Sequence, residues 1–295
     1  MSRIKTVGVL GCGQMGSGIA QVIAAAGFKV LVRDLQADLL ARGRKTIEQS
    51  LAKFVEKGTL DAGARDASLD RITFTTDLKD LAGCELVIEA VTEDLELKNR
   101  QWAALDDICP PETVFASNTS SLSIMAMATV TGRPDRFLGL HFFNPVPMMP
   151  LVEVVRTVAT SPDSLEEASA FVRRLGKEPI AAKDSAGFIV NLLLVPYMLD
   201  AVRAVERGVA SVADIDTGMK LGCGHPMGPL TLLDFVGLDT AMKVGEILYQ
   251  EFREARYAPP PLLKRMVLAG WFGKKSGKGF YDWSAKPPVP TELGL

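Results

Sequence analysis

Residues Val7–Gly16 (VGVLGCGQMG) carry the clearest structural signal in the first part of the chain. It runs from a short apolar segment into the pattern Gly-x-Gly-x-x-Gly, and a helix-period segment, residues 14–26, follows. The first glycine of this pattern permits a tight turn, the second lets backbone approach a pyrophosphate, and the third lets the helix pack closely on the strand. The positive end of that helix faces the phosphates of a dinucleotide. The residues predicted to contact such a cofactor here are Gly11, Gly13, Gln14, Met15 and Gly16.

An acidic residue, Asp34, follows the second predicted strand, residues 29–33. A carboxylate at this place accepts hydrogen bonds from the adenosine ribose and repels a 2′-phosphate, which favours NAD over NADP. Arg33 beside it would offset part of that repulsion. The alternative is a glycine-rich turn without a ligand, followed by a surface aspartate. Strand, helix and acidic residue together favour NAD.

Short apolar segments alternate with helix-period segments through the first half of the chain, the pattern of an α/β fold with a doubly wound, mainly parallel sheet. The predicted strands are residues 6–10, 29–33, 71–75, 86–90, 113–117, 137–142, 151–156 and 178–181, and the predicted helices are 14–26, 37–57, 95–107, 121–129 and 164–175.

The β-rich segments end at residue 183. Beyond it helices are predicted near 188–207, 212–221, 230–252 and 260–269. The expected organisation is therefore a nucleotide-binding domain, residues 1–183, and a second, all-helical domain, residues 184–295. The proline-rich tail 286–290 is predicted to be a loose end.

Composition excludes several classes of function. Lys and Arg number 33 against 35 Asp and Glu, which gives no electrostatic reason to expect nucleic acid or a membrane as partner. The most apolar stretch, residues 187–199, is too short to span a bilayer, and a buried helix is expected there. The cysteines lack metal-ligand spacing, so we expect packing residues, no metal site and a cytoplasmic protein. They are Cys12, Cys84, Cys109 and Cys223.

The chemistry is predicted at the end of strand 137–142, where His141 is followed by a proline-rich loop. Strand ends are where ligands bind in an open α/β sheet. Twelve residues later Glu153 interrupts an apolar strand, and a carboxylate there needs a partner. If the loop returns the chain antiparallel, the two side chains face each other as a base and its orienting carboxylate. The alternatives are a hydrogen-bonded core histidine and a solvated edge-strand glutamate.

Two further polar positions stand out. Residues 116–121 close another strand with small hydroxyl and amide groups, so Ser120 is a candidate to bind a substrate oxygen, although Ser120 or Ser121 would equally serve as a helix N-cap. Asn191 stands alone in an apolar run, where a buried amide requires hydrogen-bond partners.

Over nearly its whole length the sequence resembles the short-chain L-3-hydroxyacyl-CoA dehydrogenases, including bacterial 3-hydroxybutyryl-CoA dehydrogenases. The segments that carry the resemblance are the glycine motif, ASNTSSL (116–122), GLHFFNPVP (139–147), LVEVV (151–155), DSAGFIVN (184–191), PMGP (226–229) and FGKKSGKGFY (272–281). The resemblance implies a Rossmann-type domain that binds NAD, with an acyl-CoA substrate bound between the two domains. It also implies a homodimer formed through the helical domain.

By this resemblance His141 is the general acid/base, Glu153 its partner, and Ser120 and Asn191 hold the reacting oxygen. It further implies NAD contacts from Asp34, Glu93, Lys98, Ser120, Asn144 and Lys275, and CoA contacts from Ser50 and Lys57. One position departs from the family pattern, because Leu192 stands where an arginine is usual. The rival function is an NAD-dependent dehydrogenase of a small hydroxy acid or sugar acid, similar to the lambda-crystallin and gulonate dehydrogenase group. A protein that binds NAD without turnover is a further alternative.

Overall fold

The structure, a computed structural model, describes residues 4–294. The chain divides into two compact units after Phe188. The sequence placed this boundary after residue 183. The difference arises because Phe188 is only 4% exposed and belongs to the same core cluster as Leu10 and Val155 of the first unit.

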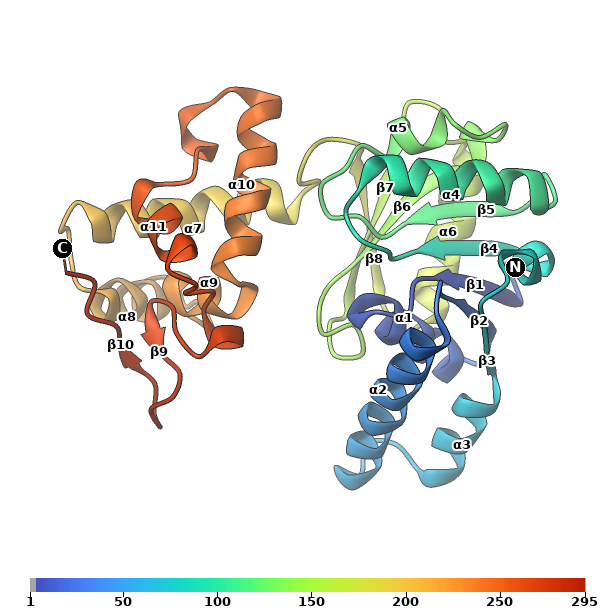
Figure 1. The fold of residues 1–295 in the computed structure, drawn as a ribbon, viewed down its shortest axis with the longest axis horizontal. Helices are drawn as coiled ribbons and strands as arrows, with labels where there is room; N and C mark the ends of the chain where they lie inside the picture. Colours follow the sequence, from blue (N-terminus) through green and yellow to red (C-terminus); the bar gives the residue numbers. More distant parts are fainter. Residues whose placement is uncertain (1–3, 295) are drawn as a thin grey trace. The chain divides into compact units, whose positions relative to one another are not determined.

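The first unit is built on an eight-stranded sheet in the order β3-β2-β1-β4-β5-β6-β7-β8 (Figure 1). All neighbours are parallel except β6 and β7, which pair antiparallel. The mainly parallel, doubly wound sheet expected from the sequence is therefore confirmed. Its strands are β1 (Thr6–Leu10), β2 (Lys29–Arg33), β3 (Ile72–Thr75), β4 (Leu86–Glu89), β5 (Val114–Ser117), β6 (Phe137–Phe142), β7 (Leu151–Arg156) and β8 (Glu178–Lys183).

Helices cover both faces of this sheet. One apolar cluster joins the sheet to α1 (Gln14–Ala25), α2 (Ala37–Glu56) and α6 (Pro162–Arg174). The other joins it to α4 (Leu95–Ile108) and α5 (Ile124–Ala128). Because both faces are buried, the central strands are continuous apolar runs and their polar residues stand at the strand ends.

A helical hairpin of α2 and α3 (Ala62–Asp70) extends from the β3 end of the sheet (Figure 1). The sequence did not predict α3, since its nine residues carry little apolar periodicity. Its start is fixed instead by Asp61, whose carboxylate accepts the N–H of Ala64 at 2.8 Å.

The second unit contains α7 (Val190–Glu206), α8 (Val212–Cys223), α9 (Pro229–Val236), α10 (Leu238–Phe252) and α11 (Pro261–Leu268). The single helix expected over 230–252 is wrong, because Gly237 has a φ of +98° and breaks it into α9 and α10. The unit is also not all-helical. Strand β9 (Tyr281–Asp282) pairs with β10 (Val289–Pro290), so part of the tail expected to be loose is held in a small sheet.

Two expectations about burial are corrected as well. In α7 the side chain of Leu193 is 63% exposed, so this helix is not fully buried. Cys12, Cys84 and Cys109 are buried as expected, but Cys223 is exposed. Within residues 4–294, no helix combines the length and the apolar character that crossing a bilayer requires.

Two buried aspartates organise the second unit. Asp216 accepts the N–H groups of Leu230 and Thr231 at 2.8 and 2.9 Å, so it caps the start of α9. Asp234 accepts the N–H groups of Phe280 and Tyr281, each at 2.9 Å, and the indole N–H of Trp283 at 2.8 Å. Leu230 and Thr231 directly follow PMGP, and Phe280 and Tyr281 end FGKKSGKGFY. Each of the two segments therefore adjoins donors to a buried carboxylate, which needs hydrogen bonds because it is buried.

We expect Asp234→Ala to lower the free energy of unfolding by about 3 kcal/mol, since three donors lose their acceptor. Urea unfolding followed by circular dichroism measures this. Asp200→Ala is the matched control: Asp200 makes an exposed ion pair with Arg203 at 2.7 Å, and its loss should cost under about 1 kcal/mol. Equal losses of unfolding free energy in Asp234→Ala and Asp200→Ala would contradict the stabilising role given to the Asp234 hydrogen bonds.

Candidate active site

The glycine motif forms the turn between β1 and α1. Gly11 has a φ of +99°, and a Cβ there would lie 2.7 Å from the carbonyl oxygen of Ala90. A Cβ on Gly16 would lie 1.9 Å from the oxygen of Gly11, so only glycine lets the helix approach the turn. A Cβ on Gly13 would instead meet no protein atom within 4 Å. The space beside Gly13 is therefore open at the start of α1, whose N-terminus has no side-chain cap.

Asp34 lies directly after β2, beside this turn. Its carboxylate accepts the N–H of Cys12 at 2.7 Å and the N–H of Leu35 at 2.7 Å. The side chain is half-buried, so it is held against the glycine turn and still reached by solvent. Arg33 directs its Nε to the carbonyl oxygen of Thr76 at 3.3 Å.

His141 and Glu153 are directly opposite in the antiparallel pairing of β6 with β7. His141 Nδ1 lies 2.6 Å from Glu153 Oε2, and both side chains are buried. The bond uses Nδ1, so Nε2 is the nitrogen left for proton transfer. The rings of Phe143 and Phe188 lie 4.5 and 5.6 Å from the imidazole, centroid to centroid, and give it an apolar surround. A carboxylate on Nδ1 fixes both the tautomer and the orientation of a histidine.

The loop between these strands is fixed on α1. A Cβ on Gly18 would lie 2.9 Å from Val146, so the loop packs directly on the helix. Asn144 is exposed and accepts a hydrogen bond from Gln14 Nε2 at 3.1 Å. The buried ammonium of Lys177 donates to the carbonyl oxygens of Val146 and Met149 at 2.7 and 2.6 Å. Burial lowers the pKa of Lys177.

Ser120 belongs to a polar network at the ends of β4 and β5. Glu93 Oε1 accepts the N–H of Ser120 at 2.9 Å and the hydroxyl of Thr119 at 2.7 Å. Glu93 Oε2 lies 3.1 Å from the ammonium of Lys98. The next helix begins at Ile124 with Ser123 as its N-cap, so neither Ser120 nor Ser121 caps it. The network brings together three sequence-predicted positions, Glu93, Lys98 and Ser120.

Opposing effects act on the pKa of Glu93. Burial alone would raise it, but the charge of Lys98 and the hydrogen bonds from Thr119 and Ser120 outweigh burial, and the pKa lies below its usual value. A carboxyl whose pKa is lowered on folding stabilises the protein above its unfolded pKa of about 4.3. That stability is lost as pH falls through the folded value.

We therefore expect the stability difference between wild type and Glu93→Gln to be largest at neutral pH and to shrink below about pH 4.3. Urea unfolding at pH 7, 5 and 3.5 measures the difference. A difference that stays constant over this range would show that the ionised carboxylate of Glu93 does not stabilise the fold.

The remaining predicted positions belong to helix α2 of the first unit or to the second unit. Ser50 is half-buried on α2, and Lys57 is exposed at the C-terminal end of the same helix. Asn191 and Lys275 belong to the second unit, where Lys275 pairs with Asp239 at 2.6 Å. Asn191 is half-buried in the first turn of α7, which corrects the expectation of a buried amide.

Sequence reasoning missed two side chains that hold the site together, Glu89 and Lys177, and it gave Ser117 and Asn118 no individual role within the polar cluster 116–121. Asn118 Oδ1 accepts the N–H of Phe142 at 2.9 Å and so joins the ends of β5 and β6. Glu89 ends the apolar strand β4, the same signal that identified Glu153, and it was available in the sequence. Lys177 gave no signal, because a lysine before a strand is usually solvated.

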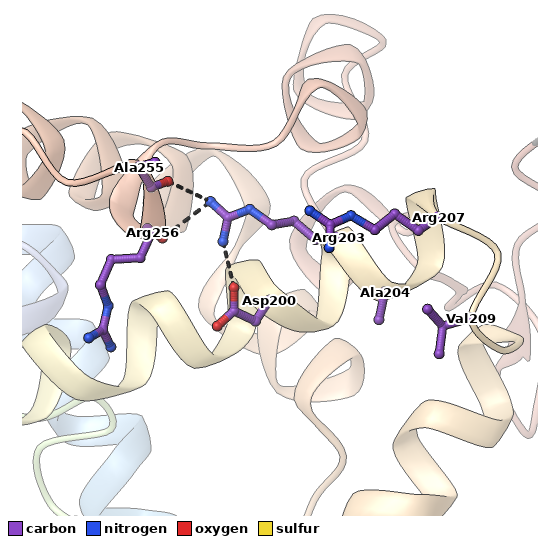
Figure 2. A pocket seen from close by; sticks show the side chains of 7 residues that line it. All are labelled: Asp200, Arg203, Ala204, Arg207, Val209, Ala255 and Arg256. Atoms are coloured by element: carbon purple, nitrogen blue, oxygen red, sulfur yellow. Dashed lines mark hydrogen bonds and ion pairs between the residues drawn. The ribbon is translucent and has the colours of Figure 1, made fainter.

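A hollow of about 410 Å³ in the second unit is lined by the C-terminal half of α7 and by Ala255 and Arg256 (Figure 2). Arg203 pairs with Asp200 of the same helix at 2.7 Å and donates to the carbonyl oxygens of Ala255 and Arg256, each at 3.2 Å. Its guanidinium is thus used to join two segments of this unit. Among the residues described, no group of three or more His, Cys, Asp and Glu side chains is arranged to hold a metal ion.

Comparisons with known proteins cover almost the whole chain. Residues 6–185 match the family model of the 3-hydroxyacyl-CoA dehydrogenase NAD binding domain, and residues 187–283 match that of the 3-hydroxyacyl-CoA dehydrogenase C-terminal domain. The chain is 50% identical to the 3-hydroxybutyryl-CoA dehydrogenase of Mycobacterium tuberculosis over 282 residues, 95% of this chain and 99% of the relative. It is 47% identical to the mitochondrial hydroxyacyl-coenzyme A dehydrogenase of Homo sapiens over 287 residues, 95% of this chain and 91% of the relative. The crystal structure of (S)-3-hydroxybutyryl-CoA dehydrogenase from Ralstonia eutropha superposes with a TM-score of 0.92 at 44% identity, covering 96% of this chain and all of that one.

Proposed function

The chain belongs to the 3-hydroxyacyl-CoA dehydrogenase family, and we propose that it interconverts a 3-hydroxyacyl-CoA and the 3-ketoacyl-CoA with NAD. The observation that carries the proposal is the 2.6 Å bond between His141 and Glu153. This bond orients a base that lies near the end of β6. The loop that follows β6 packs on the nucleotide-binding helix α1.

The residues at the start of α1 fit the cofactor. Gly13 leaves open space where a pyrophosphate would approach backbone, and the uncapped N-terminus of the helix offers N–H groups to an anion. Asp34 stands where the adenosine ribose is bound in this fold. Its charge disfavours a 2′-phosphate, and Arg33 is engaged by Thr76. Glu93, Lys98, Ser120 and Asn144 are the further proposed contacts in this unit.

In the proposed oxidation, bound NAD supplies the acceptor of the hydride that leaves C3. His141 Nε2 takes the proton of the 3-hydroxyl group, and the carboxylate of Glu153 stabilises the imidazolium through Nδ1–H. Ser120 holds the reacting oxygen while it becomes a carbonyl oxygen. In the reverse direction His141 returns the proton to that oxygen. Acid/base catalysis of this kind contributes about 10² to 10⁴ in rate.

The acyl carrier separates this function from the rival dehydrogenase of a hydroxy acid or sugar acid. Ser50 and Lys57 lie two turns apart on α2, a spacing that places them on one side of the helix. We propose them as CoA contacts, with the exposed lysine meeting a phosphate. For Asn191 and Lys275, in the second unit, we propose the substrate and NAD contacts that the family resemblance implies.

We further propose a homodimer formed through the second unit, whose exposed apolar side chains include Leu193, Phe235 and Val236. A cytoplasmic location is proposed from the scattered spacing of the four cysteines, which is typical of a reducing compartment.

The test is NADH oxidation by the purified protein with acetoacetyl-CoA, compared with free acetoacetate, and with NADPH in parallel. Hydroxy acids and sugar acids are assayed in the opposite direction, by reduction of NAD. We expect turnover with the thioester and NADH, and at least about tenfold lower kcat/KM with NADPH, since Asp34 meets the 2′-phosphate. Turnover of free acids without turnover of any 3-ketoacyl-CoA would overturn the CoA assignment and favour the rival.

A further inference from the structure

Three charged side chains lie together at the ends of β4 and β5. Glu89 is 0% exposed and Lys98 is 1% exposed, and the Lys98 ammonium lies 2.5 Å from Glu89 Oε1. The same ammonium lies 3.1 Å from Glu93 Oε2. Glu89 also accepts the hydroxyl of Ser117 at 2.6 Å and the N–H of Val91 at 2.8 Å. Glu89 is therefore hydrogen-bonded from a strand, a loop and a helix.

Stability alone does not account for the burial of Glu89 and Lys98. A buried ion pair recovers little beyond its cost of desolvation, and apolar side chains of the same volume often serve the fold as well. The connections of the cluster lead instead to the site. Lys98 is held by Glu89 on one side and by Glu93 on the other, and Glu93 directs its second oxygen to Thr119 and Ser120.

We propose that Glu89 is a positioning residue of the cofactor site. Its carboxylate fixes the Lys98 ammonium, and through Lys98 it sets the place of the Glu93 carboxylate and of Ser120. Without that carboxylate, Glu93 is the single acidic partner of Lys98 in the cluster and is drawn away from Ser120. The inference rests on the proposed function, which assigns Glu93, Lys98 and Ser120 to NAD.

The experiment measures NADH binding by isothermal titration calorimetry, with no acyl-CoA present, for Glu89→Gln, Lys98→Met and the double variant. We expect each single change to weaken binding about tenfold, and the double variant to bind within threefold of Lys98→Met. Non-additivity follows if Glu89 acts through Lys98. If Glu89 had only a structural role, the loss of binding free energy in Glu89→Gln would instead add to the loss in Lys98→Met. Losses that multiply in the double variant, or wild-type affinity in Glu89→Gln, would overturn the proposal.

Asp106→Asn is the matched control. Asp106 lies on α4, the helix that carries Lys98, and pairs with Arg133 at 2.6 Å, away from the cluster. Its loss should lower the melting temperature without changing NADH affinity. If Glu89→Gln and Asp106→Asn lose NADH affinity equally, Glu89 has no special part in positioning.

Ser117→Ala keeps the proposal testable if Glu89→Gln does not fold, because it removes one hydrogen bond from Glu89 and leaves every charge in place. We expect about threefold weaker NADH binding, and no further loss in the Lys98→Met background. Unchanged affinity in Ser117→Ala would then overturn the proposal. A wild-type protein that does not bind NADH would overturn this inference and the proposed function together, whereas one that binds NADH but ignores acyl-CoA would contradict the substrate class alone.

Discussion

Replacing His141 by glutamine is expected to lower kcat for acetoacetyl-CoA reduction by about 10² to 10⁴, the usual contribution of a general acid/base. Glutamine keeps a polar group of similar size but cannot exchange a proton at neutral pH. NADH affinity should change little, because His141 is proposed to act on the substrate oxygen and not on the nucleotide. Steady-state kinetics together with NADH titration separates the two effects.

His225→Gln is the control for this change, since His225 is the other histidine of the chain and lies in the second unit. Its ring nitrogen Nδ1 lies 3.0 Å from the hydroxyl of Tyr197, a contact outside the proposed chemistry. We expect kcat within about threefold of wild type, equivalent to less than about 1 kcal/mol in the barrier. Equal losses in the two variants would contradict the role given to His141.

Two alanine substitutions in the glycine motif, Gly16→Ala and Gly13→Ala, are expected to weaken NADH binding for different reasons. At Gly16 a Cβ would lie 1.9 Å from the oxygen of Gly11, so α1 must move away from the sheet. We expect Gly16→Ala to destabilise the protein by about 1 to 3 kcal/mol or more, the range for overpacked interiors. NADH binding should be lost with it, because the helix N-terminus no longer meets the turn.

Gly13→Ala should separate binding from folding. A Cβ there meets no protein atom within 4 Å, and the φ of −73° suits alanine, so urea unfolding without cofactor should match wild type. NADH affinity should fall at least about tenfold, since the methyl group occupies the space left for the pyrophosphate. If the Gly13→Ala variant bound NADH with wild-type affinity, this space would not hold the cofactor.

Local signals in the sequence were sufficient to predict most strands and helices of the first unit. The glycine motif predicted the β1 turn and α1, and the central strands were visible as apolar runs because the sheet is covered on both faces. The positions of His141 and Glu153 also followed from local features, a strand end and a charge in an apolar strand. Their direct opposition depends on the antiparallel return of β7, which the proline-rich loop between them indicated without requiring it.

What the sequence did not predict depends on contacts between distant segments. Lys177 holds a loop about thirty residues away through two carbonyl oxygens, and no local pattern marks such a lysine. The tail was expected to be loose because prolines disfavour regular structure, but β10 pairs with β9 beside the segment that Asp234 anchors. Gly237 breaks a long apolar periodicity because the chain turns there between α9 and α10.

Hydride transfer to C3 is followed with acetoacetyl-CoA and NADH carrying deuterium at both C4 positions of the nicotinamide. The 3-hydroxybutyryl-CoA formed is analysed by mass spectrometry. Hydride transfer to C3 predicts one deuterium at that carbon for each NADH consumed, with the hydroxyl proton taken from solvent through His141. A hydroxyacyl product without deuterium at C3, or NADH consumed with no such product, would show that the protein does not catalyse this hydride transfer.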